Sequence, residues 1–433
     1  MKNNKHQPGH LSFVDMNLSS LLDPKNKLYD LSNKIDWSYF EEEFSVLYSD
    51  TGRPAKAIRL MVGLLFLKQL ENLSDEMVVE RWVQNPYYQY FCGEIEFQWQ
   101  FPVAASDLVH FRHRIGPKGA EKLLTVSINL HGKKALEKEV FVDTTVQEKN
   151  ITFPTDSKLH KKISEKSIKI AKDAGIKLRR TYKRTLTSLL QSQHNRSHPK
   201  RAKKARSAAR RLKTIAGSLV RELRRKLPAE KLLKHKKELE IFEAVLAQTR
   251  KSKNKIYSLH ETEVCCISKG KEHKKYEFGQ KVSIAKTRKN GIIVGALLCE
   301  NNPYDGHTLH EVFKQIQRLT GKNPQICSAD RGYRGVTSIG EIQIKIPKPP
   351  KKKATQYEKY KERKRFRERA GIEPVISHLK HGFRAKRNFL KGLHGDSFNI
   401  IMAAAAYNLK KWLKSHSLYI FLQYYFHFKT MKT

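Results

Sequence analysis

Two aspartates in the sequence stand where ordinary strand structure has little use for a carboxylate. Asp143 lies in the middle of Glu139 to Val146, whose alternation and β-branched residues predict a strand, and Asp330 directly follows a second predicted strand, Pro324 to Ala329. Burying an unpaired carboxylate costs several kcal/mol, so a partner is required. Oxygen ligands suit Mg²⁺ or Mn²⁺, and carboxylates from adjacent strands can bridge a metal pair. The alternative, an aspartate that caps a turn, is the better interpretation of Asp330 taken alone.

A third acid lies among cations further along the chain. Arg369, Glu373 and Lys380 are spaced i, i+4 and i+11, so on a single helix they would share one face. Gly371 and Pro374 interrupt such a helix, and a restart near Glu373 would place its carboxylate at a helix N-terminus, where the dipole favours the ionised form. The alternative is a solvated basic helix with incidental salt bridges.

The ordered acids Asp143, Asp330 and Glu373, with the Arg-x3-Glu-x6-Lys spacing, resemble the DDE transposases of bacterial insertion sequences. The resemblance is closest to the branch with a Tyr-x2-Arg-x3-Glu-x6-Lys (YREK) signature. It covers roughly residues 50–415, and the spacing gains specificity from the flanking phrases. The signature tyrosine is Phe366 here, so its hydroxyl contact to a phosphate is lost while ring packing survives. Phrases similar to that branch are Arg53-Pro-Ala-Lys-Ala-Ile-Arg59, Asn85-Pro-Tyr-Tyr-Gln-Tyr-Phe91, Ala329-Asp-Arg-Gly-Tyr-Arg334 and Arg387-Asn-Phe-Leu-Lys-Gly392.

The resemblance implies an α/β fold, an RNase H-like mixed sheet with flanking helices. Asp143 would lie on its first strand, Asp330 after its fourth and Glu373 on a following helix. These three acids would be catalytic and would hold two Mg²⁺ (or Mn²⁺) ions, with Asp143 bridging both. Such ions activate water or a DNA 3′-hydroxyl for in-line attack on a phosphodiester, without a covalent enzyme intermediate.

Double-stranded DNA, as transposon ends and target, is the partner that the resemblance implies, together with a homodimer that pairs two ends. Arg369 and Lys380 would hold the terminal phosphate, a task that a guanidinium fork and an ammonium suit. The residues expected to contact DNA are Arg369, Lys380, Phe366, Arg331, Tyr333, Arg384 and Arg387.

Periodicity predicts the elements that must position these residues. Residues 1–130 form an N-terminal helical domain, with a helix over Pro54 to Leu70 and others capped by Ser74 and Ser106; it could read DNA through a helix-turn-helix or dimerise. Residues 131–415 form the catalytic domain, and residues 416–433 a C-terminal tail. The further expected strands are Glu263 to Ser268, Tyr276 to Lys286, Ile292 to Leu298 and Ile342 to Ile346.

Helices complete the catalytic domain. Thr308 and Glu311 fit a capping box that opens a helix to about Leu319, and residues 355–381 are mainly helical. A basic helical insertion spans residues 158–250, with Pro228 starting a new helix inside it. An Asn-Gly turn at Asn290 predicts a hairpin between two of the strands.

The positive charge is concentrated in two segments. The chain of 433 residues carries 85 Lys and Arg against 42 Asp and Glu, a net charge of +43 that points to a polyanionic partner. Residues 151–250 hold 29 basic against 8 acidic residues, and residues 345–391 hold 17 against 4, whereas residues 1–100 hold 10 against 14. We therefore expect the insertion to be a DNA clamp; a helical hairpin with a solvated charged face is the alternative.

Composition excludes several other classes. The five cysteines form no C-x-x-C pair, and no phosphate-binding G-x-x-x-x-G-K-[ST] sequence occurs. Met1 to His10 has no apolar signal region, and the apolar run Leu60 to Leu67 is too short to cross a bilayer. We expect a cytoplasmic protein of a bacterium or archaeon, associated with the nucleoid and not with a membrane.

The expected function is that of a transposase, which binds transposon ends and catalyses metal-dependent DNA cleavage and strand transfer. Two alternatives stay open at this point. One is a non-catalytic DNA-binding protein, and the other is a nuclease that cuts without joining strands.

Overall fold

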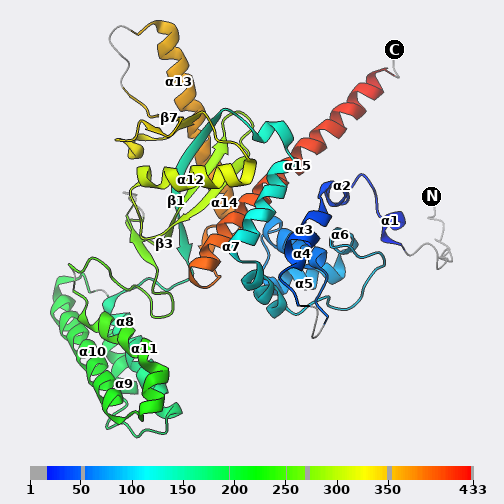
Figure 1. Ribbon diagram of the computed structural model, residues 1–433. Coiled ribbons are helices and arrows are strands. Elements are labelled where there is room, and N and C mark those ends of the chain that lie inside the picture. The colour runs from blue at the N-terminus through cyan, green and yellow to red at the C-terminus, as the bar shows by residue number, and fades with distance from the viewer. Residues whose placement is uncertain are drawn as a thin grey trace, which may run out of the picture. The chain divides into compact units, whose positions relative to one another are not determined.

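A computed structural model describes residues 17–49, 54–194, 196–249, 251–268, 274–348 and 354–430, with side chains as far as Ser415. The predictions made for Met1 to His10 and for Arg53 lie outside these residues. The chain divides into two units (Figure 1). Unit 1 comprises Met1–Gln147 and Lys281–Thr433, and unit 2 comprises Glu148–Gln280.

The described strands form one mixed sheet. Its order is β2-β3-β1-β5-β7-β6, with β4 also pairing with β3 and β8 with β1. β1 runs parallel to β5, and β5 parallel to β7, whereas β3 and β4 form the predicted antiparallel hairpin. The six predicted strands are confirmed with small shifts at their ends. The bounds are β1 Glu139–Lys149, β2 Cys265–Ile267, β3 Glu277–Thr287, β4 Ile293–Cys299, β5 Ile326–Ser328, β6 Ser338–Ile339, β7 Ile342–Lys345 and β8 Arg387–Asn388.

The N-terminal residues of unit 1 are helical, as predicted. Ser74 caps α5, because its side chain accepts a hydrogen bond from the Met77 amide in the first turn of that helix. α4 begins at Ile58, four residues after Pro54, and is buried around almost its whole circumference, so it is a central core helix. The bounds are α1 Leu18–Leu21, α2 Lys27–Lys34, α3 Trp37–Ser45, α4 Ile58–Leu70, α5 Asp75–Gln84, α6 Pro86–Phe91 and α7 Ala105–Asn129, followed by a short 3₁₀ turn, η2 Gly132–Ala135.

Two predicted helix starts are wrong. α7 begins at Ala105, before Ser106, and the Asp107 carboxylate accepts the amide of its N-cap residue, Ala104. α12 (Asp305–Thr320) begins three residues before Thr308. The Thr308 hydroxyl donates to the Asp305 carbonyl instead of capping an amide, which is the common alternative bond of a threonine inside a helix.

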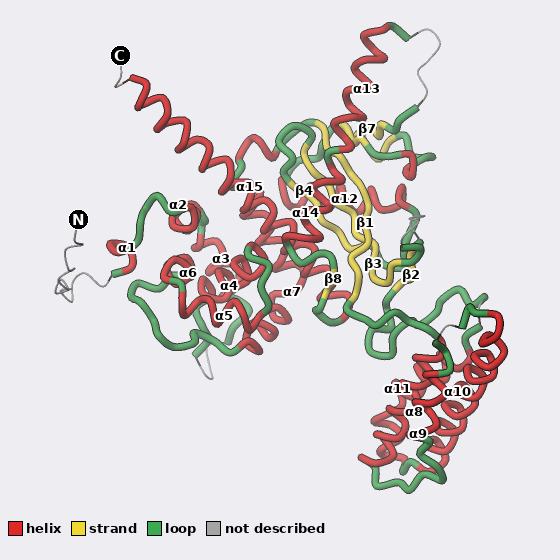
Figure 2. Tube along the Cα trace, turned by 180° about the vertical axis from the view of Figure 1, so that it is seen from behind, coloured by secondary structure: helices red, strands yellow, loops and turns green. Residues whose placement is uncertain are grey.

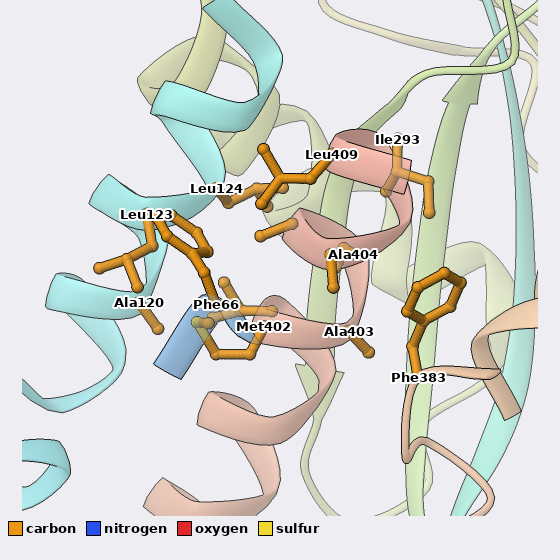
Figure 3. Close-up of a cluster of buried hydrophobic side chains, with 14 of the residues drawn as sticks. Phe66, Ala120, Leu123, Leu124, Ile293, Phe383, Met402, Ala403, Ala404 and Leu409 are labelled. Atoms are coloured by element: carbon orange, nitrogen blue, oxygen red, sulfur yellow. The ribbon is translucent and has the colours of Figure 1, made fainter. Parts of the chain in front are cut away.

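Helix α15 (Gly392–Thr430) organises the core of unit 1. Its residues Ala403 to Ala406 are fully buried, and their small side chains let the helix lie close to its neighbours. Figure 3 shows side chains of α4 and α7 on one side of α15 and Ile293 of β4 on its other side. Thus the N-terminal helices and the sheet share one hydrophobic core. The residues predicted to be a C-terminal tail begin inside α15, and the side chains of residues 418–428 lie outside the described ones.

Side-chain amides close the free edge of β4. Asn408 of α15 bonds both the amide and the carbonyl of Ile293, at 2.9 Å each. Gln315 of α12 does the same at Ala296, at 2.8 and 3.2 Å. These bonds satisfy strand groups that would otherwise be exposed at the sheet edge, and they fix both helices against the sheet.

Outside its strand residues, unit 2 consists of four helices joined by loops in the described part of the chain (Figure 2). Its helices are α8 Asp156–Asp173, α9 Lys183–Gln191, α10 Pro199–Lys226 and α11 Ala229–Ala247, and Pro228 is the N-cap of the last. Two apolar clusters of its own, one around Leu223 and Phe242 and one around Leu212 and Leu219, hold these helices together. Among the described residues of the whole chain, no helix is long and apolar enough to span a membrane.

Candidate active site

Asp143 and Asp330 lie at the same edge of the sheet. The parallel register pairs Phe141 of β1 with Ser328, the last residue of β5, and Asp143 and Asp330 each follow that pair by two residues. Parallel strands present their carboxyl ends at one edge, which is where ligands bind in open α/β sheets. The strand register therefore agrees with the expectation that carboxylates of two adjacent strands lie close together.

One guanidinium joins the two aspartates. The Arg369 Nη2 atom lies 3.0 Å from Asp143 Oδ2 and 3.8 Å from Asp330 Oδ2. Asp143 also accepts the Thr144 amide at 2.8 Å, and Asp330 accepts the Gly332 amide at 2.8 Å. The space between the carboxylates is thus already held by a positive charge, and backbone amides fix both acids in place.

Several ion pairs between α13 and the sheet position Arg369 next to β1. Arg369 lies in the last turn of helix α13 (Gln356–Ala370), and Arg365, one turn earlier, donates to Glu139 at 2.9 Å with both side chains buried. Glu139 and Asp143 share one face of β1, just as Arg365 and Arg369 share one face of α13. Arg288 adds bonds to Glu139 and Glu368, at 2.6 and 2.7 Å. The helix is therefore anchored to the strand that carries Asp143.

Glu373 lies on a separate helix. α13 ends at Ala370 and α14 (Ile372–Gly382) begins two residues later, so the predicted break and restart are confirmed. Lys286 of β3 donates to the Gly371 carbonyl at 2.8 Å and fixes the junction. The Glu373 side chain is exposed in the first turn of α14. The structure thus brings together Asp143, Asp330 and Arg369, whereas Glu373 lies on the next helix, α14.

A further acid, Asp305, lies beside the two aspartates and was missed from the sequence. Its Oδ1 atom accepts bonds from Lys281 Nζ at 2.9 Å and from the Thr144 hydroxyl at 3.0 Å. A Cβ atom at Gly332 would stand 2.9 Å from Asp330 Oδ1 and 3.2 Å from Asp305 Oδ2, so only glycine fits between these carboxylates. The charged Lys281 within a predicted strand was the available signal, because a buried ammonium requires an acidic partner.

Tyr333 corrects one prediction about DNA contacts. The side chain is fully buried in the core of unit 1, so it is not on the surface where DNA could touch it. Burial, followed by the charges of Asp143 and Asp305, raises the pKa of its hydroxyl far above the ordinary value. That hydroxyl makes no hydrogen bond to any described residue.

The other residues predicted to contact DNA differ in how exposed their side chains are. Arg331 and Arg387 are exposed, whereas Phe366 and Lys380 are half-buried. Arg384, also half-buried, donates to the Asn72 carbonyl at 3.1 Å. Arg384 and Arg387 line a cavity of about 830 Å³ together with residues of α5 and α7.

That cavity is bordered by a buried ion triad. Asp75 of α5 bonds Arg112 through both carboxylate oxygens, at 2.7 Å each, and Lys68 at 2.7 Å. The cationic side chains are less than 10% exposed, at 9% for Lys68 and 7% for Arg112. Burial lowers the pKa of Lys68 to about 8, and the nearby Arg112 acts in the same direction. One carboxylate therefore compensates two buried cations.

The residues at the sheet edge fit a divalent cation in part. Asp143 and Asp330 offer hard oxygen donors on both sides of a position that a guanidinium now holds, and two buried polar atoms, the Tyr333 hydroxyl and Arg369 Nε, have no hydrogen-bond partner among the described residues. Within the described ranges, no three His, Cys, Asp or Glu side chains stand close enough to share a metal ion. Two of the three predicted ligands are thus in place, and Glu373 does not complete the set in this conformation.

Comparisons with known proteins identify two transposase domains in this chain. A model of a transposase domain (DUF772) matches residues 16–114, and a model of the transposase DDE domain matches residues 234–409. The second match includes Asp330 and Glu373 but begins after Asp143. A protein of Rhizobium meliloti, described as uncharacterized protein ORF8 in the nfe locus, is 46% identical over 173 residues, which are 39% of this chain and 83% of that protein. No solved structure shows a significant match.

The two domain matches define a class, the transposases with a DDE domain. Within that class, this chain belongs to the insertion-sequence transposases.

Proposed function

We propose that this transposase binds the ends of its element as double-stranded DNA and catalyses metal-dependent strand cleavage and strand transfer, with Asp143, Asp330 and Glu373 as its catalytic acids. The observation that carries the proposal is the meeting of Asp143 and Asp330 under one guanidinium at the sheet edge. Because transposition requires two ends to be held together, the protein acts on DNA as a homodimer.

The catalytic fold is proposed to be RNase H-like and the branch to be the YREK branch. The path β4-β3-β1-β5-β7, with its parallel side beyond β1 and its antiparallel hairpin on the other, supports the fold. Arg369, Glu373 and Lys380 support the branch, with Phe366 in place of the signature tyrosine.

The chain's own groups set up the reaction. When bound, two Mg²⁺ or Mn²⁺ ions would activate the attacking oxygen and stabilise the leaving oxygen of the phosphodiester. Asp143 and Asp330 would hold these ions at the sheet edge, and Glu373 would add a carboxylate from α14. Arg369 neutralises the two aspartates before DNA binds, then turns to a phosphate, for which its planar fork is suited. Lys380 lies two turns along α14 as a second phosphate ligand.

A strand-joining assay tests the function. Inverted repeats identified in the DNA that flanks the coding region supply the end substrate, and a supercoiled plasmid supplies the target. With Mg²⁺ we expect 3′ ends of the substrate to become covalently joined to the plasmid. Nicks without joined products would identify a nuclease, and binding without nicks would identify a non-catalytic DNA-binding protein.

Replacing Arg369 tests whether its guanidinium competes with cations. We expect Arg369→Gln to bind Mn²⁺ more tightly in the absence of DNA, by roughly tenfold, because one positive charge about 4 Å from the site opposes a cation by about 1–4 kcal/mol. Electron paramagnetic resonance of free Mn²⁺ measures this affinity. DNA cleavage should fall in the same variant, since the phosphate contact is lost.

Arg367→Gln is the matched control for that measurement. Arg367 lies on the same helix and carries the same charge, but its side chain is exposed. Its Mn²⁺ affinity should stay within about twofold of the parent, because solvent and salt screen the charge. Weaker Mn²⁺ binding by Arg369→Gln would contradict the competition.

A further inference from the structure

Unit 2 contains a groove whose walls are rich in arginine. It encloses about 1380 Å³ between the loop that joins α8 to α9 and the C-terminal half of α10. The loop contributes Lys177, Arg179 and Arg180, and the helix contributes Arg221 and Arg225. We call this feature the α10 groove.

The loop wall of the α10 groove is fastened to the helix. The Glu222 carboxylate of α10 accepts the Arg179 amide at 2.9 Å. Lys226 donates to the Lys177 carbonyl at 2.9 Å and to Glu222 at 2.7 Å. The bonds to Arg179 and Lys177 use backbone groups of the loop, so the side chains of Arg179 and Arg180 are exposed to solvent.

An apolar floor makes the α10 groove rigid. Leu219 of α10 is 1% exposed, and Leu178 and Tyr182 of the loop pack against its cluster. Because the apolar face of α10 is buried by this packing, its arginines lie on the solvent-exposed face of the helix. The positions of the charges are therefore set by folded structure and not by a flexible tail.

The positive charges of the α10 groove are only partly compensated. Arg224 bonds Glu243 through two nitrogens, and Lys226 bonds Glu222. The guanidinium groups of Arg180, Arg221 and Arg225 make no ion pair with any described residue. Like charges at such spacing repel each other, and a bound anion would relieve that repulsion.

We propose that the α10 groove is a docking site for the phosphate backbone of duplex DNA, separate from the acids at the sheet edge. Guanidinium groups bind phosphate oxygens through two parallel hydrogen bonds, which suits a repeated phosphate backbone. The aromatic ring in the groove, Tyr182, is half-buried in the floor, so the groove offers no open platform on which unpaired bases could stack. This inference rests on the proposed function for the identity of the nucleic acid.

Salt dependence of binding by the full-length protein tests the proposal. The variant Arg180→Gln, Arg221→Gln, Arg225→Gln removes three exposed charges from the α10 groove without touching the bonds that fasten its loop. Fluorescence anisotropy with a duplex of about 30 base pairs, over a series of salt concentrations, gives the slope of log affinity against log salt. We expect the slope to become shallower by up to about 2.7, because each lost phosphate contact contributes about 0.9.

A matched control removes three charges from another face of the same unit. Lys234→Gln, Lys236→Gln, Lys237→Gln changes exposed lysines of α11 that do not line the α10 groove. Its slope should change by less than about 1. An unchanged slope in the groove variant, or an equal change in both variants, overturns the proposal.

Two further readouts separate this inference from the proposed function. Single-stranded DNA or duplex RNA that binds with the same slope and the same dependence on the groove arginines would overturn the assignment to duplex DNA. Mg²⁺-dependent nicking by the parent protein is measured in parallel. One outcome is a parent protein that shows no nicking while the groove variant still has a shallower slope of log affinity against log salt. That result would support the docking site and contradict the catalytic proposal.

Discussion

Asp143→Asn is expected to abolish Mg²⁺-dependent strand cleavage, with a loss of at least about a thousandfold, because a carboxylate that holds the cations supplies several kcal/mol of transition-state stabilisation. The substitution keeps the side-chain volume and removes the charge that now binds Arg369. Supercoiled plasmid, separated by gel electrophoresis after incubation with Mg²⁺, measures the rate. DNA affinity should stay within about threefold of the parent, since phosphate contacts by arginine and lysine dominate it.

Glu311→Gln is the control for that result. Glu311 lies on α12 of the same unit, its side chain is 57% exposed, and its ion pair is with Lys314. This variant removes one acidic charge and should cleave at the parent rate. Cleavage by Asp143→Asn at more than about a tenth of the parent rate would remove Asp143 from the catalytic site.

Asp75→Asn is expected to destabilise unit 1 by about 3–5 kcal/mol, because it leaves two buried cations without a counter-charge. Lys68 and Arg112 would then face each other in a site with little water. All four tryptophans of the chain, Trp37, Trp82, Trp99 and Trp412, belong to unit 1, so their fluorescence during urea unfolding reports this unit alone.

The pH dependence of the same site has a definite sign. The pKa of Lys68 is about 8 in the folded protein against an ordinary value of 10.5, so between these values the unfolded chain binds more protons. The contribution of Lys68 to stability therefore rises as pH increases from about 8 to about 10.5. Below pH 8 both states are protonated, and the full cost of burying the ammonium is present.

A second substitution checks the cause of the Asp75 effect. Adding Lys68→Met to Asp75→Asn removes one of the two uncompensated charges and should restore part of the lost stability. The exposed-pair variant Glu311→Gln should change the free energy of unfolding by no more than about 1 kcal/mol. An Asp75→Asn variant as stable as this control would show that the triad contributes little.

Local features of the site were predictable because local chemistry determines them. The alternation of β1, the Asn-Gly hairpin before β4, the Ser74 cap and the helix break at Gly371 each follow from a few neighbouring residues. The meeting of Asp143 with Asp330 follows from the parallel pairing of β1 with β5.

Other features depend on contacts between distant segments. Nothing in the sequence near Arg369 says that its guanidinium turns inward to two aspartates, because Glu139 and Glu368 position the helix that carries it. Tyr333 resembles a surface residue of a polar turn, yet the turn folds its ring into the core. Asp305 was hidden because Thr308 and Glu311 fit a capping signal that tertiary packing of α12 overrides.

The place at which unit 2 enters the chain affects how the protein is made. β1 and β3 are neighbours in the sheet, but residues 148–280 separate unit 1 residues of the two strands. During synthesis β1 must wait for β3, and at about 5–20 residues per second that delay is roughly 7–30 s. The apolar strand that carries Asp143 is therefore unpaired on the ribosome for that time, and a cell that makes this transposase slowly gives chaperones and proteases a longer opportunity to act on it.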